Sequence, residues 1–314
     1  MASWAHSRGF ALDIIREVSD AAIEVRGLRK SYGDFEAVKG IEFEVRRGEV
    51  FGLLGPNGAG KTTTVEILEG YRQRSGGEVA VLGFDPGRRP RELRSRVGIV
   101  LQSTGLYRHI RVREALVHFA SMYPHPRDVA EVISLTGLEG KEDASVRTLS
   151  GGQLRRLDLA LALVGDPEVI FLDEPTTGFD PAARRNAWDA IRSLKALGKT
   201  VLLTTHYLDE AQSLADRVAI IKDGRIIIEG EPHQLGANTG AATYRVSYRN
   251  GDGGLVQRET EDPTTLLHEL TGAALAEGRR LEGLSVTRPT LEDVYLELTA
   301  DEPTEASEGA ADGR

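Results

Sequence analysis

The chain has 314 residues, of which 40% are apolar, and a formal net charge of −9 at pH 7. This length and composition are typical of a globular protein with one large domain and a small additional unit. The acidic average disfavours nucleic acid as a partner, because proteins that bind it usually present a basic face. No apolar run approaches the roughly 20 residues that a membrane span needs. The chain has no cysteine, which excludes disulfides and thiolate metal sites.

The first segment, residues 1–20, is predicted to be an N-terminal extension. It has no long apolar stretch and no cleavage-like site, so it does not read as a secretory signal. A frayed or locally docked terminus is the favoured interpretation. An amphipathic helix that binds a partner is the alternative, since Phe10, Ile14 and Val18 are apolar.

Strands and helices alternate over residues 21–236. Alternating apolar and polar residues predict strands within 23–52, and helical patterns are expected over 62–69 and across most of 103–148. Further strands are predicted at 169–172, 200–204 and 218–222, with helices between them. Strands that alternate with helices imply a parallel sheet covered on both faces. The predicted fold class is therefore α/β.

A second pattern begins after the looser composition at 236–240. A strand over 243–248, a helix over 263–277 and a strand over 284–288 predict a small α+β domain within 241–300. A closing helix over 291–298 is expected, with Thr290 as its N-cap and Asp293 at the capping-box position. The tail, 301–314, has five acidic residues and one Arg and is predicted to be disordered.

A glycine-rich stretch between an apolar strand at 50–54 and a helix predicts a phosphate-binding loop. It reads Gly55-Pro56-Asn57-Gly58-Ala59-Gly60-Lys61-Thr62-Thr63. Glycines let the backbone N–H groups wrap a phosphate, and the helix N-terminus adds a favourable dipole. We expect Lys61 to pair with the β- and γ-phosphates of ATP and the Thr62 hydroxyl to ligate Mg²⁺. A chance Gly-rich turn is the disfavoured alternative.

Two acids follow the apolar run 169–172. Asp173 ends a buried strand, where a carboxylate is costly unless a cation such as Mg²⁺ is near. Glu174 points elsewhere and is a candidate general base that orients the attacking water. An ordinary solvated strand end is the alternative, and the upstream phosphate loop makes it the weaker one.

A second glycine-rich element lies before the acidic strand. It reads Leu149-Ser150-Gly151-Gly152-Gln153 and heads a predicted helix, which gives a second N-terminus that favours anions. The order of phosphate loop, glycine-rich signature and acidic strand resembles the ATP-binding cassette (ABC) family. The resemblance implies a P-loop NTPase core with an antiparallel β subdomain and a helical subdomain over about 103–160. It also implies a head-to-tail homodimer, in which each signature caps the ATP of the other copy.

Four further residues match motifs of the ABC family. By resemblance, Gln102 contacts Mg²⁺ and the attacking water, and His206 in the segment 204–211 senses the γ-phosphate. Tyr32 matches the aromatic residue that stacks on adenine, and Asp180 matches the residue of the loop that crosses the dimer interface. A structural histidine and an ordinary surface tyrosine are the alternatives for His206 and Tyr32.

The remaining segments resemble ABC-2-type drug-export ATPases, including daunorubicin-resistance-type subunits. The similar stretches are 102–107 with 111–116, and 289–296 after the small α+β appendage. The resemblance implies an ATPase subunit on the cytoplasmic face of the membrane, which works with a separate permease. Export of a lipid, a polysaccharide precursor or an ion is the first alternative. A soluble ABC ATPase that regulates nucleic acid or translation is the alternative from another class.

Overall fold

The computed structural model describes residues 20–100, 105–235, 244–250, 253–287, 291–292 and 295. Up to residue 235 its elements are β1 (Ala21–Tyr32), β2 (Phe35–Arg46), β3 (Val50–Leu54), α1 (Lys61–Leu68), β4 (Gly76–Val81), the 3-10 helix η1 (Pro86–Arg88), α2 (Arg91–Arg94), β5 (Val97–Val100), α3 (Val112–Ala120), α4 (Val129–Leu135), the 3-10 helix η2 (Val146–Thr148), α5 (Gly151–Leu163), β6 (Val169–Asp173), α6 (Pro181–Ala196), β7 (Thr200–Thr205), α7 (Leu208–Leu214), β8 (Arg217–Lys222) and β9 (Arg225–Gly230). A second group follows, with β10 (Tyr244–Arg249), β11 (Leu255–Thr260), α9 (Pro263–Ala276) and β12 (Glu282–Thr287). Except for Asp20, the predicted extension over 1–20 lies outside the described residues, as do the tail over 301–314 and most of the closing helix.

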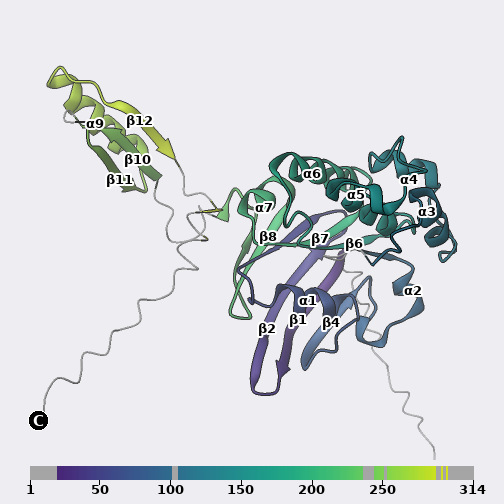
Figure 1. Ribbon diagram of the computed structural model, residues 1–314. Coiled ribbons are helices and arrows are strands. Elements are labelled where there is room, and N and C mark those ends of the chain that lie inside the picture. The colour runs from purple at the N-terminus through teal and green to yellow at the C-terminus, as the bar shows by residue number, and fades with distance from the viewer. Residues whose placement is uncertain are drawn as a thin grey trace, which may run out of the picture.

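A six-stranded sheet forms the centre of the first group, in the order β5-β6-β7-β3-β8-β9 (Figure 1). Its neighbours pair in parallel from β5 to β8, and β9 pairs antiparallel with β8. The turn between β8 and β9 has positive φ angles at Asp223 (50°) and Gly224 (77°), as a tight two-residue hairpin requires. The parallel sheet and this hairpin confirm the predictions from the sequence.

Both faces of the central sheet are buried by apolar side chains, because successive strand residues point to opposite faces. In β6, Val169 and Phe171 belong to the cluster that contains α1 and the strands of a second sheet. Ile170 and Leu172 belong to the cluster formed with α5 and α6. The phosphate-loop helix α1 is therefore packed between two sheets, while α5 and α6 cover the other face.

The second sheet has three antiparallel strands in the order β2-β1-β4. The sequence did not predict β4, whose first residues Gly76 and Gly77 lower its strand propensity. Pairing with β1 sets its conformation, with Val25 opposite Val79 and Ile23 opposite Val81. Tertiary pairing thus outweighs local preference here.

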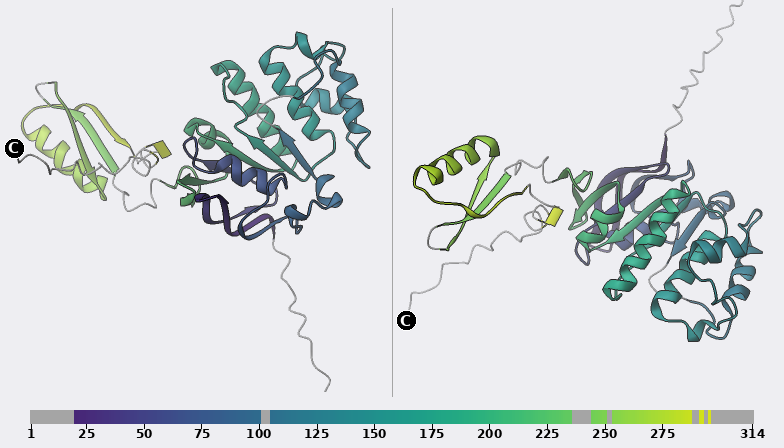
Figure 2. Two further views of the ribbon diagram at one scale, coloured as in Figure 1. Left: turned by 60° about the horizontal axis from the view of Figure 1, so that its bottom comes forward. Right: turned by 90° about the horizontal axis from the view of Figure 1, so that it is seen from above.

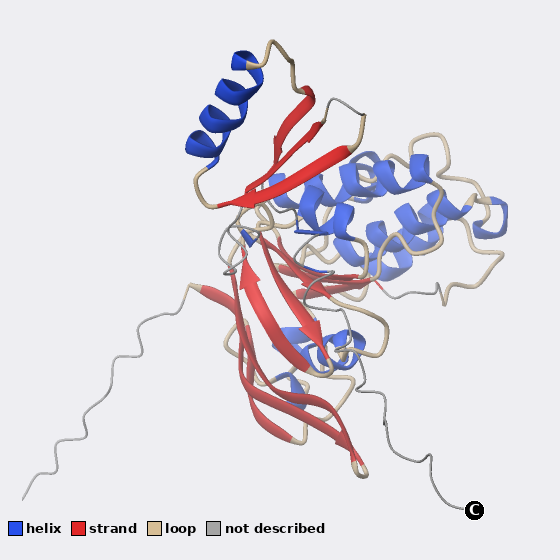
Figure 3. Cartoon of the chain, turned by 90° about the vertical axis from the view of Figure 1, so that its left-hand side faces the viewer, coloured by secondary structure: helices blue, strands red, loops and turns tan. Residues whose placement is uncertain are grey.

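The helices α3, α4 and α5 form a helical subdomain (Figure 3). Leu116 of α3 and Val132 of α4 pack with Leu157 of α5. The same helix also packs against the central sheet, through Leu159 and Leu163. The second half of α5 therefore lies between the central sheet and the other helices of the subdomain.

The second group of elements is a small α+β unit (Figure 2). Its strands form an antiparallel sheet in the order β11-β10-β12, and α9 packs against β10. The strand β11 was not predicted from the sequence. Farther on, Leu291 is 1% exposed and packs in the cluster that contains Leu54 and Leu235 of the first group.

Candidate nucleotide-binding site

The loop between β3 and α1 has a backbone that glycine alone fits at two positions. Gly60 has φ of 105°, and a Cβ there would lie 2.8 Å from the carbonyl oxygen of Ala37. A Cβ on Gly55 would lie 2.2 Å from the carbonyl oxygen of Ile221. The loop leads directly into α1 at Lys61, so the N-terminal N–H groups of this helix face the loop region.

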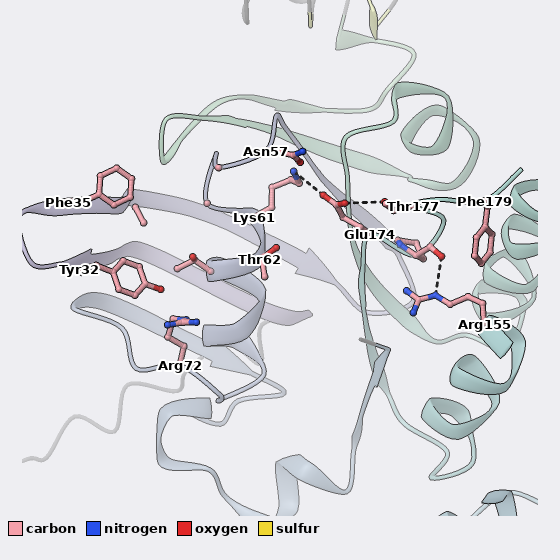
Figure 4. A pocket seen from close by; sticks show the side chains of 15 residues that line it. Tyr32, Phe35, Asn57, Lys61, Thr62, Arg72, Arg155, Glu174, Thr177 and Phe179 are labelled. Carbon is pink, nitrogen blue, oxygen red and sulfur yellow. Dashed lines mark hydrogen bonds and ion pairs between the residues drawn. The ribbon is translucent and has the colours of Figure 1, made fainter. Parts of the chain in front are cut away.

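Lys61 is buried, with its ammonium group turned into the loop (Figure 4). Its Nζ donates hydrogen bonds to the carbonyl oxygens of Gly55 (2.8 Å) and Pro56 (3.1 Å). The same Nζ lies 3.4 Å from Oε1 of Glu174. The cation and the candidate base, 113 positions apart in the sequence, therefore form one ion pair.

Three groups contact the carboxylate of Glu174. Beside Lys61, the Thr177 hydroxyl donates to Oε2 at 3.0 Å, and Nδ1 of His206 lies 3.3 Å from the same oxygen. Burial alone raises the pKa of Glu174, but the positive charge of Lys61 and the contacts with Thr177 and His206 outweigh it, so the pKa is lowered. Glu174 is therefore a carboxylate at neutral pH. Its φ of 45° is unusual for a residue with a side chain.

Asp173 and Thr62 bring oxygen atoms together beside the loop. The Thr62 hydroxyl lies 3.5 Å from Oδ1 of Asp173, and Thr204 Oγ1 donates to the same oxygen at 2.5 Å. Mg²⁺ is usually held by one or two such protein oxygens, together with water and substrate phosphates. The donor set therefore fits a magnesium ion that is shared with a phosphate chain. Gln102, the third predicted ligand, lies outside the described residues.

A cavity of about 890 Å³ extends from this region to the aromatic end of β1. Its predicted members are Tyr32, Asn57, Gly58, Gly60, Lys61, Thr62, Thr63 and Glu174. It is also lined by Phe35, Ala37, Arg72, Arg155, Pro175, Thr177 and Phe179, which the sequence analysis did not single out as site residues. The hairpin register could have found Phe35, because it lies directly opposite Tyr32. The helix spacing could have found Arg155, which lies one turn after the signature glycines.

Two cationic side chains lie over the tyrosine ring at the aromatic end of the cavity. The guanidinium of Arg72 lies 5.3 Å from the ring centroid of Tyr32, and Nζ of Lys30 lies 5.0 Å from it. Arg72 is in turn held by Glu66, at 2.5 Å. Figure 4 shows Tyr32, Phe35 and Arg72 together at one end, with Lys61 and Glu174 farther in.

The signature residues line a different cavity, of about 490 Å³, between α5 and α6. Ser150 caps α5 by accepting from Gln153 N at 3.3 Å, and the Gln153 side chain accepts from Ser150 N at 3.0 Å. Asp180 lines the same cavity and caps α6. Within one chain, then, the phosphate loop and the signature Ser150, Gly151, Gly152 and Gln153 lie in separate cavities.

A parallel sheet with a phosphate loop after β3 and an acid-ended strand β6 two positions away defines a P-loop nucleoside triphosphatase. The ABC transporter family model matches residues 38–177. Daunorubicin resistance ATP-binding protein DrrA3 of Streptomyces coeruleorubidus is 38% identical over 309 residues, which cover 91% of this chain and 98% of that protein. The chain belongs to the ABC transporter family and is an ATP-binding subunit that hydrolyses ATP. This confirms the family resemblance.

Two further similarities support the same family. Nod factor export ATP-binding protein I of Sinorhizobium fredii is 48% identical over 225 residues, which cover 70% of this chain and 66% of that protein. Among solved structures, cbiO1 from Clostridium perfringens, part of the ABC transporter complex cbiONQ, matches with a TM-score of 0.63 and 31% identity, over 70% of this chain and 92% of that one. In the part of this chain that the structure describes, no helix is long and apolar enough to span a bilayer.

Proposed function

We propose that this ATPase drives an ABC-2-type exporter and works with a separate membrane permease. The observation that carries the proposal is the match to DrrA3, which runs through the C-terminal α+β unit and covers 98% of that relative. The relative named for daunorubicin resistance favours a drug-like or other hydrophobic compound as the cargo. A lipid, a polysaccharide precursor or an ion is the alternative cargo for the same machine.

The separation of the two cavities favours a homodimer. Ser150 to Gln153 form a helix N-terminus that attracts anions, but they lie outside the cavity of their own phosphate loop. In a head-to-tail pair, the signature of one copy faces the nucleotide of the other, with Asp180 at the same interface. ATP bound between the copies would then close the dimer.

The described contacts suggest how the site responds to ATP. Tyr32 would stack on the adenine, and the phosphates would draw Lys61 from Glu174. Mg²⁺ held by Thr62, Asp173 and Gln102 would neutralise phosphate charge. When the Lys61 ammonium group moves away from Glu174, the pKa of Glu174 rises, because that charge helps to hold it low. Glu174 then becomes a better general base for the attacking water, with His206 beside it.

Substitution of Lys61 tests the nucleotide site directly. Lys61→Ala removes the cation from the loop and should weaken ATP binding by about 100-fold, measured by calorimetry. Lys141→Ala, an exposed lysine in the helical subdomain, is the matched control and should bind ATP like the wild type. Unchanged affinity in Lys61→Ala would contradict the assignment of the phosphate loop.

Co-purification tests the exporter itself. The chain is tagged in its native cell, the membranes are solubilised gently, and stoichiometric partners are identified by mass spectrometry. A protein with about six membrane-spanning helices supports the proposal. Recovery of ribosomes or nucleic acid without a membrane protein would favour a soluble ABC regulator instead.

A further inference from the structure

Three buried side-chain atoms in the described part of the chain have no hydrogen-bond partner, and they lie close together in the fold. They are Nε of Arg184, Oε2 of Glu210 and Nδ1 of His206, the last of which still lies 3.3 Å from the Glu174 carboxylate. Leaving a buried polar group unpaired costs about 1–3 kcal/mol. Arg184 lies on the first turn of α6, and the other two flank the start of α7. Their gathering at one contact needs an explanation, because most buried polar groups in folded proteins are hydrogen-bonded.

Glu210 is at the centre of this contact and is fully buried. Its Oε1 accepts hydrogen bonds from Thr176 Oγ1 at 2.8 Å and from Trp188 Nε1 at 3.1 Å. Burial raises the pKa of Glu210, although bonds from Thr205, Thr176 and Trp188 and the charge of Arg184 oppose this rise. One carboxyl group thus joins three elements of the ATPase core.

Each of these elements leads to a different part of the site. Thr176 begins the loop that ends at Asp180, and Trp188 lies two turns into the helix that Asp180 caps. Thr205 is the last residue of β7 and directly precedes His206. Glu210 therefore stands between the loop 176–180 and the histidine that contacts Glu174.

Arg184 links the same two helices on the outer side. Its guanidinium lies 4.2 Å from the ring centroid of Tyr207, and its NH1 group donates to Asp209 at 3.1 Å. The Tyr207 ring in turn lies 4.1 Å from the His206 ring, centroid to centroid. Movement of the first turn of α6 would therefore reach His206 through packed side chains.

We propose that Glu210 is a positioning residue, which transmits the engagement of the loop 176–180 by a second copy of the chain to His206. In the engaged arrangement, Arg184 Nε donates to the free Oε2 of Glu210, and α7 carries His206 into register with the nucleotide. This inference rests on the proposed dimer, because the second copy displaces the loop. It assigns a role to a buried acid that neither the phosphate loop nor the signature requires.

Steady-state kinetics test the role. Glu210→Gln keeps the side-chain shape and Trp188→Phe keeps an aromatic ring, and each weakens or removes the shared bond. Each should lower kcat about tenfold with KM within about twofold of the wild type, because ATP binding itself is untouched. The double variant should be no slower than the slower single variant, since both changes break one unit.

Glu49→Gln is the matched control for a loss of stability. Glu49 is also a buried acid, 8% exposed, but it lies before β3 and contacts Arg217 instead. Its substitution should lower Tm and leave kcat unchanged. If Glu210→Gln lowers Tm while kcat stays at the wild-type value, or if the losses in the double variant add, Glu210 is only a structural residue.

Fluorescence supplies a readout that is independent of turnover. The chain has two tryptophans, so Trp4→Phe leaves Trp188 as the sole reporter. With hydrolysis blocked by Glu174→Gln, ATP should shift the Trp188 emission, and Glu210→Gln should abolish the shift. A shift that persists in Glu210→Gln overturns the proposal. A Trp4→Phe parent that hydrolyses ATP as a monomer would contradict the dimer, and with it the basis of this inference.

Discussion

The ATPase core and the C-terminal α+β unit differ in how much they bury. In the core, β3, β6 and β7 are buried at every residue. Among the residues described between 244 and 287, only Val246 and Ala274 are buried apolar residues, while Leu255 is 63% and Leu275 is 75% exposed. A unit of this size rarely buries enough apolar surface to be stable alone. The core is therefore expected to unfold cooperatively, and the unit to open first.

The two regions also differ in what they contribute: the core lines the candidate nucleotide cavity, and the α+β unit does not. The residues that line the nucleotide cavity run from Tyr32 to Phe179, all within the core. The α+β unit contributes none of them, yet the chain returns to the core at Leu291, which packs with Leu235 at the other side of the unit. The unit is therefore held to the core at both of its ends, and we expect that changes in it leave the site undisturbed.

The largest expected effect comes from Glu174, the proposed general base in the core. Glu174→Gln removes the carboxylate but keeps its shape, and it should lower kcat at least about 1000-fold while ATP still binds. The measurement is single-turnover hydrolysis beside calorimetric ATP binding. Size-exclusion chromatography with ATP should show a stable dimer for this variant.

Glu259→Gln, the same change in the α+β unit, is the control. Glu259 is exposed and lies 3.5 Å from Arg245, so its loss should leave kcat unchanged. Normal turnover in Glu174→Gln would show that another group is the base. A large fall in kcat for Glu259→Gln would break the separation between core and appendage.

The sequence predicted the chemistry of the core better than its contacts. The phosphate loop and the acids at 173–174 were predictable, because their residue types and order carry the chemistry. The ion pair between Lys61 and Glu174 was not, since packing of the sheet brings distant residues together. Arg155 was not predicted as a site residue for the same reason. Its Nε donates to the carbonyl oxygen of Pro175 at 3.0 Å, which joins two elements of the fold.

The sequence pattern did not predict two of the edge strands. Both β4 and β11 were missed, because two glycines open the first and Arg258 interrupts the alternation of the second. Each becomes a strand through pairing with a neighbour, β1 or β10. Propensity alone does not contain such partners. In the same way, no pattern shows that Glu210 is buried among three elements.

A smaller effect is expected at the anchor of the appendage. Leu291→Ala should leave a cavity beside Leu54 and Leu235 that costs about 2–4 kcal/mol and lowers the Tm of the core by several degrees. ATP affinity should stay within about threefold of the wild type, because the nucleotide cavity lies elsewhere. Truncation after Gly236 removes the same contact and should likewise spare nucleotide binding, while dimerisation or regulation weakens.

Leu255→Ala is the control for that anchor, since Leu255 is 63% exposed and its loss should not change the Tm of the core. Differential scanning fluorimetry measures both variants. If Leu291→Ala melts like the wild type, the C-terminal segment does not anchor the unit to the core. If truncation abolishes ATP binding, the appendage is part of the core after all.

The smallest expected effect is a pH dependence at the end of α1. Glu69 lines a cavity of about 470 Å³ with Leu93 and Phe119, and burial, together with the charges of Asp173 and Glu66, raises its pKa to about 8. Because the pKa is higher in the folded than in the unfolded chain, the protonated form stabilises the fold. That stabilisation is complete below the unfolded pKa and is lost as the pH rises through about 8.

Glu69→Gln is neutral at every pH and should avoid this loss. Its Tm should exceed that of the wild type by an amount that grows from pH 5 to pH 8 and then levels. Glu78→Gln, an exposed acid on β4, should show no such growth. A constant difference for Glu69→Gln would mean that its carboxyl group ionises as freely in the folded chain as in the unfolded one. Water would then reach the Glu69 carboxyl group readily, and the core would be less closed to solvent at this cavity than along β3, β6 and β7.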